Sequence, residues 1–120
     1  MAKTILVVED FDDIRAAMRI LIELHGYKVI EATDGHEAVE MARRHRPDLI
    51  LMDLSMPAFD GITATKEIRS FPELTQIPIL AVTSYETHYT EQALAAGCSA
   101  VVEKTRFMQN IAGEIEKYLS

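Results

Sequence analysis

The sequence predicts a domain of the α/β class, in which a parallel sheet is covered by helices on both faces. Short apolar runs alternate along the chain with segments in which apolar residues recur at helical spacing. The runs at residues 5–8, 49–52 and 78–82 are apolar throughout, which is typical of strands buried on both faces of a parallel sheet. The connections are short, and no Pro/Gly-rich linker or repeat separates them. We therefore expect a single domain over residues 1–120.

The first half of the chain holds two strands and two helices. A strand at residues 5–8 is followed from Asp12 by a helical pattern that stops at Gly26, because glycine readily adopts the conformation that terminates a helix. Residues 27–32 alternate between apolar and charged side chains, as expected of an edge strand. The second helix is expected to end before Pro47, because a residue that precedes proline disfavours the helical conformation.

The second half continues the alternation to a total of five strands and five helices. The expected elements are, in order, strand 49–52, helix 62–68, strand 78–82, helix 91–96, strand 100–102 and a helix that closes the chain. The closing segment is predicted to be one continuous helix, because it carries a single apolar stripe made of Phe107, Ile111, Ile115 and Leu119.

Polar residues stand where four of the predicted strands end. Glu9 and Asp10 follow the first strand, Asp53 the third, Thr83 the fourth and Lys104 the fifth. In open parallel sheets the ligand crevice lies outside the carboxyl ends of the strands. We therefore expect these side chains to converge on one edge of the sheet.

Such a group of residues suits the transfer of a phosphoryl group. Three neighbouring carboxylates repel one another unless a cation compensates, and Mg²⁺ prefers a site of a few carboxylates completed by water and substrate oxygens. An aspartate such as Asp53 can act as a nucleophile that forms an acyl phosphate, while Lys104 and Thr83 hold phosphoryl oxygens. Alternatively, Glu9 and Asp10 only begin a helix, but Asp12 and Asp13 already supply acidic caps there.

Composition excludes several other classes of protein. The formal net charge of −7 argues against a nucleic-acid surface, and the basic cluster Arg43, Arg44 and Arg46 is expected at a helix end, where it opposes the helix dipole. No apolar run is long enough to cross a membrane, and the start of the chain does not have the form of a secretory signal. The single Cys98 cannot form an internal disulfide, so a cytoplasmic location is expected.

Four segments together resemble the receiver domains of two-component response regulators. They are Val-Val-Glu-Asp near the start, Leu-Ile-Leu-Met-Asp-Leu-Ser-Met-Pro in the middle, Ala-Val-Thr-Ser, and Val-Glu-Lys. Their order and spacing match over essentially the whole chain, as does the Met56-Pro57…Asp60-Gly61 loop. The resemblance implies a flavodoxin-like three-layer fold whose five parallel strands follow the order 2-1-3-4-5.

The resemblance also implies a role for each site residue. Asp53 would be phosphorylated, and Mg²⁺ would be bound by Asp10 and Asp53, by Glu9 through water and by the backbone carbonyl of Ser55. Thr83 would hydrogen-bond the phosphoryl group and move towards it on activation. Lys104 would pair with Asp53 at rest and with the phosphoryl oxygens afterwards.

Two positions depart from the pattern of the family. Receivers usually carry Tyr or Phe three residues before the lysine, and its rotamer reports phosphorylation, whereas this chain has Val101. Tyr85 is a candidate for part of that role, and a partly exposed loop aromatic is the alternative. A proline in a cis peptide usually follows the lysine, whereas this chain has Thr105. We expect a trans Lys104–Thr105 bond, because a cis bond before a non-proline residue costs about 3 kcal/mol.

The first functional hypothesis is a stand-alone phosphorylation switch that is not an enzyme acting on other substrates. Its phosphodonor would be a histidine kinase or histidine phosphotransfer protein, and its signal would pass to a downstream protein through altered binding, as a monomer or as a phosphorylation-dependent homodimer. The alternative is a pseudo-receiver that binds partners without phosphorylation, which Val101 and Thr105 favour and the retained acidic and lysine positions oppose. An aspartyl-phosphate phosphatase of the haloacid dehalogenase type would need an aspartate at the position of Ser55.

Overall fold

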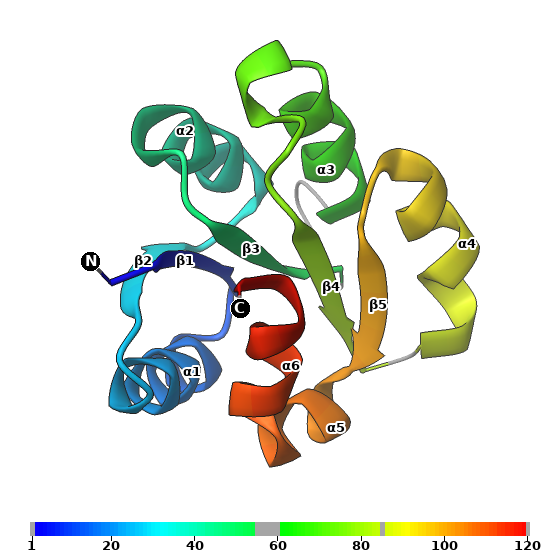
Figure 1. Ribbon diagram of the computed structural model, residues 1–120. Helices are drawn as coiled ribbons and strands as arrows, with labels where there is room; N and C mark the ends of the chain where they lie inside the picture. Colours follow the sequence, from blue (N-terminus) through cyan, green and yellow to red (C-terminus); the bar gives the residue numbers. More distant parts are fainter. Residues whose placement is uncertain (1, 55–60, 85, 120) are drawn as a thin grey trace.

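The five-stranded parallel sheet at the centre of the molecule confirms the predicted α/β class. The computed structural model describes residues 2–54, 61–84 and 86–119. Its strands lie in the order β2-β1-β3-β4-β5 and all neighbours run parallel. This order confirms the flavodoxin-like topology (Figure 1). The strands are β1 Thr4–Val8, β2 Lys28–Ala32, β3 Leu49–Asp53, β4 Ile79–Thr83 and β5 Ala100–Glu103.

Helices cover both faces of the sheet and form the two outer layers. Figure 1 shows α1, α5 and α6 on one face and α2, α3 and α4 on the other. The helices are α1 Asp12–Leu24, α2 Gly35–His45, α3 Gly61–Arg69, α4 Glu86–Ala96, α5 Lys104–Gln109 and α6 Ile111–Leu119, with a short 3-10 helix, η1, at Pro72–Leu74.

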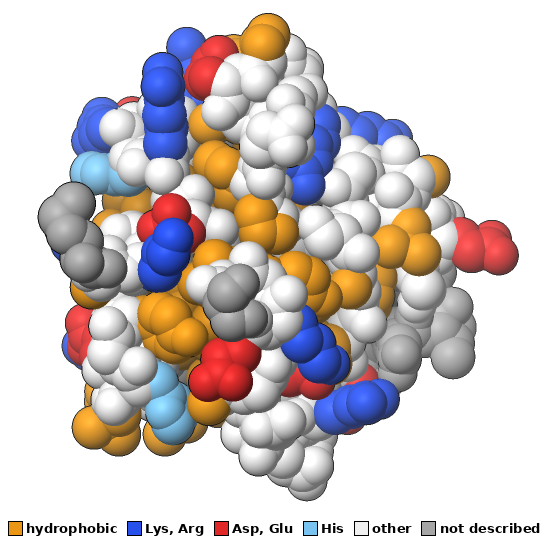
Figure 2. All heavy atoms as spheres, in the orientation of Figure 1, with side chains coloured by type: hydrophobic (Ala, Val, Ile, Leu, Met, Phe, Trp, Pro, Cys, Tyr) orange, Lys and Arg blue, Asp and Glu red, His pale blue; other side chains and the backbone are white. Residues whose placement is uncertain are grey.

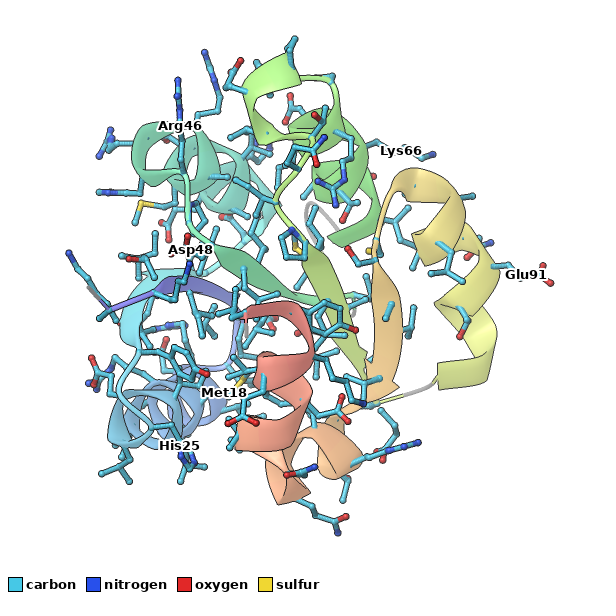
Figure 3. The ribbon with its side chains drawn as sticks, viewed as in Figure 1. Met18, His25, Arg46, Asp48, Lys66 and Glu91 are labelled. Carbon is cyan, nitrogen blue, oxygen red and sulfur yellow. The ribbon has the colours of Figure 1, made fainter. Side chains whose placement is uncertain are left out.

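Each face of the sheet has its own hydrophobic core. Alternate residues of the central strands point to opposite faces, so that in β1 Leu6 belongs to one cluster and Val7 to the other. Met18 lies between α1 and α6 in the second cluster (Figure 3). Because the central strands are buried on both faces, every residue of β3 and β4 is buried, which explains their continuous apolar sequence.

The helix α2 has a capping residue at each end. Asp34 accepts a hydrogen bond from the backbone N–H of Glu37 at 2.8 Å, and the Glu37 side chain accepts from the N–H of Thr33 at 2.9 Å. The first bond caps an N–H group that has no partner within the helix, and the second ties the Glu37 side chain to the residue before the N-cap. The predicted basic cluster lies at the other end of α2, with Arg43 and Arg44 in the last turn and Arg46 as the C-cap. Figure 2 shows basic side chains gathered over this part of the molecule.

The closing segment of the chain differs from the prediction of one continuous helix. It is divided into α5 and α6 at Asn110, whose backbone leaves the helical conformation with φ −146° and ψ 56°. The side chain of Asn110 accepts a hydrogen bond from the N–H of Gly113 at 3.3 Å, and thus starts a new helix. The apolar stripe survives the break, because Phe107 and Ile111 still pack in the same core.

Several polar side chains on or near the helices face solvent. His25, at the end of α1, and Glu91, on α4, point away from the body of the molecule (Figure 3). His36 and His45 are also exposed. Among the helices of the described residues, none is both long enough and apolar enough to span a membrane.

Candidate functional site

Four strands end almost level with one another and bring the predicted site residues to one edge of the sheet. The pairing of residues at the ends of these strands defines the level: Val8 with Met52, Asp53 with Val82, and Thr83 with Glu103. Glu9 follows Val8 and Lys104 follows Glu103, so both leave the sheet at the level of Asp53 and Thr83. The register therefore gathers residues from positions 9 to 104 at one edge.

The carboxylates of Glu9, Asp10 and Asp53 form a cluster at this edge. Each offers an oxygen atom, and these three atoms lie within 4.8 Å of one another. Glu9 and Asp53 are almost fully buried, with 1% and 3% of their surface exposed, whereas Asp10 is partly exposed. Hard oxygen donors at this separation suit a divalent cation such as Mg²⁺, which bridges carboxylates and keeps several waters. The donor set therefore fits the metal that the sequence predicts.

The electrostatics of Glu9 show how costly the cluster is without a cation. Burial, and then the neighbouring charge of Asp53, raise the pKa of Glu9 from 4.5 to about 7. Hydrogen bonds from the Phe11 N–H, at 3.2 Å, and from Lys104 act in the opposite direction. A bound cation would remove the repulsion that raises this pKa.

Lys104 reaches into the cluster from the start of α5. Its Nζ donates to Oε1 of Glu9 at 3.0 Å, and only 18% of the lysine side chain is exposed. The resemblance implied a pair between Lys104 and Asp53 in the resting protein, which stays a prediction. The ammonium group lies at the carboxylate cluster, where it offsets part of the negative charge.

Thr83 ends β4 beside Asp53 and is completely buried. Two predicted residues lie outside the described part of the chain. They are Ser55, the expected backbone ligand of Mg²⁺, and Tyr85, the candidate switch aromatic.

The two departures from the family pattern have local structural consequences. Val101 pairs with Ala81 and packs against the core under α2, α3 and α4. The described residues contain no cis peptide bond, so the expected trans Lys104–Thr105 bond is confirmed. The N–H of Thr105, which a proline would lack, donates to the Glu103 side chain at 3.1 Å.

This bond makes Glu103 the cap of α5. Glu103 also accepts from the N–H of Arg106 at 3.2 Å, and α5 begins directly after β5, at Lys104. The hydrogen bond from the Thr105 N–H is the main cause that lowers the pKa of Glu103 below its usual value of 4.5. The backbone N–H at position 105 is therefore one of the two N–H groups that Glu103 caps at the start of the helix that carries Lys104.

The structure gives a role to two residues near the site: Gly61, which the sequence analysis named only as part of a family loop, and Arg15, which it did not name. Gly61, the first residue of α3, lies so close to β3 that an added Cβ would overlap the carbonyl oxygen of Asp53 and lie 2.9 Å from the Met52 side chain. Arg15, in the first turns of α1, donates to the carbonyl oxygen of Glu9 at 2.9 Å. An arginine five residues after Asp10 is visible in the sequence, but only the fold shows that it turns back to β1.

Comparison with known proteins agrees with this geometry. The family model described as the response regulator receiver domain matches residues 5–116. The polar-differentiation response regulator DivK of Brucella anthropi is 38% identical over 120 residues, a match that covers 99% of this chain and 98% of the relative.

Solved structures show the same similarity. A putative response regulator from Chloroflexus aurantiacus has a TM-score of 0.91 at 26% identity, with coverage of 99% of this chain and 98% of the other. The receiver domain of the Pseudomonas aeruginosa sensor histidine kinase PA1611 has a TM-score of 0.90 at 31% identity, with 98% of each chain covered. That structure holds a magnesium ion coordinated in its active-site cleft.

Proposed function

Since this chain belongs to the response regulator receiver domain family, we propose that it is a stand-alone phosphorylation switch in which Asp53 accepts a phosphoryl group. The phosphodonor is a phosphohistidine on a histidine kinase or a histidine phosphotransfer protein. The observation that carries the proposal is the meeting of three carboxylates within 4.8 Å at strand ends, with the Lys104 ammonium 3.0 Å from one of them. The stand-alone form is supported by the relatives, whose own length the chain matches almost completely.

The chemistry follows from the charges at the site. A carboxylate oxygen of Asp53 attacks phosphorus, the P–N bond of the phosphohistidine breaks, and the donor imidazole leaves with the electron pair of that bond. Glu9, Asp10 and Asp53 would hold Mg²⁺, with the carbonyl of Ser55 as a further ligand. The bound ion supplies neutralisation of negative charge on the phosphoryl oxygens.

Lys104 and Thr83 have the remaining roles. The Lys104 ammonium, which bonds Glu9 in the resting protein, is close enough to the cluster to serve a phosphoryl oxygen once the new group is formed. Thr83 supplies a hydroxyl hydrogen bond from the end of β4. Movement of these groups would favour one of two surface states, and a downstream protein would bind that state.

Intact-protein mass spectrometry tests the proposal. The protein is incubated with acetyl phosphate and Mg²⁺, and a single phosphoryl group should add about 80 Da. Asp53→Asn should abolish the gain, as should a chelator. Asp13→Asn is the matched control, because Asp13 is exposed in the first turn of α1, and this variant should be phosphorylated normally.

The same experiment distinguishes the phosphorylation switch from a pseudo-receiver, the alternative that the valine at position 101 favours. A protein that gains no mass and binds no Mg²⁺ would be a module that acts through unphosphorylated binding. A gain that survives Asp53→Asn would place the phosphoacceptor elsewhere in the chain.

A further inference from the structure

The side chain of Arg15 links three separate segments around the end of β1. Its Nη1 donates to the carbonyl oxygen of Glu9 at 2.9 Å, its Nη2 lies 2.7 Å from Oδ1 of Asp12, and its Nε lies 3.3 Å from Oε1 of Glu31 on β2. Only 15% of the Arg15 side chain is exposed, and its bond to the carbonyl of the buried Glu9 is shielded from water, whereas Asp12 and Glu31 are themselves 85% and 37% exposed. The guanidinium group is therefore held in a fixed position beside the turn from β1 to α1.

That turn carries the first two residues of the proposed metal site. The carbonyl group that Arg15 binds belongs to the peptide unit that joins Glu9 to Asp10. The N–H of Glu9 is fixed by the carbonyl oxygen of Ala32 at 3.1 Å, and its side chain is fixed by Phe11 and Lys104. The hydrogen bond from Arg15, a side chain of α1, thus holds the plane of the peptide that leads into Asp10.

Loss of this bond would disturb the direction of the Asp10 side chain. Glu9 is almost completely buried, and a buried carbonyl group without a partner is costly, so the peptide would turn to find another donor. A rotation of the Glu9–Asp10 peptide moves the Cβ of Asp10 relative to Asp53. The three carboxylate oxygens, now within 4.8 Å of one another, would then lose the arrangement that suits a cation.

The positive charge of Arg15 acts in the opposite direction from its hydrogen bonds. The ion pairs, that with Asp12 most of all, raise the pKa of Arg15, so the group stays charged. A cation near a metal site repels the metal, and its removal alone should tighten metal binding. The two possible roles of Arg15 therefore predict opposite signs for the effect of a neutral substitution.

We propose that Arg15 is a positioning residue that fixes the Glu9–Asp10 turn, and thereby sets the Mg²⁺ affinity of the site. This inference rests on the proposed function, because it takes Mg²⁺ as the ligand of the carboxylate cluster. Residues that orient metal ligands typically change metal affinity by about 10- to 100-fold when they are replaced.

Calorimetric titration with Mg²⁺ tests the inference on the wild type, on two Arg15 variants and on a control variant. Arg15→Met keeps the length of the side chain and removes its donors and charge, and its Mg²⁺ dissociation constant should rise about tenfold or more. Arg15→Lys keeps the charge but has a single ammonium that cannot span three partners, and it should also bind more weakly. Circular dichroism in chelator checks that each variant is folded.

Arg19→Met is the matched control. Arg19 also approaches Glu31, with its Nε 3.7 Å from Oε2, and it bonds Glu23 at 3.4 Å on the outer face of α1. The Arg19→Met variant loses the same positive charge as Arg15→Met, but no bond to Glu9 is lost with it. Its Mg²⁺ dissociation constant should stay within about twofold of the wild type, because exposed ion pairs contribute little.

Phosphorylation kinetics provide a second readout. With limiting Mg²⁺, Arg15→Met should react slowly with acetyl phosphate, and with saturating Mg²⁺ its rate should return to within about twofold of the wild type. A rate that stays low at saturation would place Arg15 in the chemical step and overturn the positioning role.

The outcomes of the titration distinguish this inference from the function on which it rests. A wild type that binds no Mg²⁺ would overturn the proposed function. A wild type that binds Mg²⁺ while folded Arg15→Met binds equally or more tightly would overturn only the role of Arg15. Should Arg15→Met fail to fold, Arg15→Lys is the variant compared with the wild type, and unchanged Mg²⁺ affinity in that variant would overturn the inference.

Discussion

The Nζ of Lys104 lies 3.0 Å from Oε1 of Glu9, and these two residues are 95 positions apart in the chain. The bond connects the first residue of α5 with the residue that follows β1. Since burial and the charge of Asp53 raise the pKa of Glu9, this ammonium group is one of the few features that favour the ionised form.

Replacement of Lys104 should destabilise the metal-free protein in a pH-dependent manner. In Lys104→Met the ionised Glu9 loses its partner, and the free energy of unfolding in chelator should fall by about 1–3 kcal/mol at about pH 8. Near pH 5.5 the loss should shrink, because Glu9 is protonated in both proteins. Urea unfolding measures both values. Lys66→Met, at an exposed position on α3, is the control and should leave the unfolding free energy unchanged at both pH values. An equal loss at both pH values in Lys104→Met would contradict the assigned ion pair.

The pKa of Glu9 also predicts how stability depends on pH. Between its unfolded value of 4.5 and its folded value of about 7, the folded protein binds more protons than the unfolded chain. Stability in chelator should therefore decrease as pH rises through this window, by about 3 kcal/mol from this group. Glu9→Gln removes the titration, so the difference in unfolding free energy between Glu9→Gln and wild type should grow towards pH 7. A constant difference would show that Glu9 has an ordinary pKa.

The contact between Gly61 and β3 predicts that even one methyl group disturbs the site. In Gly61→Ala the new Cβ would overlap the carbonyl oxygen of Asp53, so α3 or the end of β3 must shift. We expect a loss of about 1–3 kcal/mol in unfolding free energy and slower phosphorylation by acetyl phosphate. Thermal unfolding and intact-mass kinetics measure the two effects.

Gly26 supplies the comparison for that substitution. An added Cβ at Gly26 would meet no atom within 4 Å, but its φ of 90° is strained for alanine. Gly26→Ala should thus lower stability without slowing phosphorylation. Normal kinetics in Gly61→Ala would contradict the proposed effect on Asp53.

The cap of α5 predicts a titration that depends on Thr105. The pKa of Glu103 is lowered mainly by the backbone N–H of Thr105, so Thr105→Pro should bring this pKa back towards 4.5. Thr105→Ala retains the N–H and should keep most of the lowering. NMR titration of the Glu103 carboxyl carbon reads the pKa directly, and an unchanged value in the proline variant would show that the backbone bond is not its cause.

The strands and the edge that holds the site could be predicted from the sequence because each depends on a general rule. A run such as residues 49–52 is apolar because both faces of a central strand are covered, and Asp53 comes next because parallel strands all end at the edge where ligands bind. The strand order required the family resemblance, since alternation of strands and helices fits several arrangements.

Other features depend on contacts that sequence spacing does not reveal. The helix break at Asn110 arises from one side-chain cap, while the apolar stripe through Phe107 and Ile111 continues as if the helix were whole. Arg15 matched an ordinary helix residue, and its bond to Glu9 exists only because α1 folds back along β1. Gly61 is required by the close approach of α3 to β3, which its place after a loop did not indicate.

The most direct measurement identifies the atom that receives phosphate. The protein is phosphorylated with acetyl phosphate and Mg²⁺ and then treated with borohydride, which reduces an acyl phosphate to an alcohol. Tandem mass spectrometry of the peptides should find homoserine at position 53, and only when acetyl phosphate and Mg²⁺ were both present before the reduction. Reduction at any other carboxylate would contradict the account. So would a phosphate that resists borohydride, as a phosphate ester of serine or threonine does.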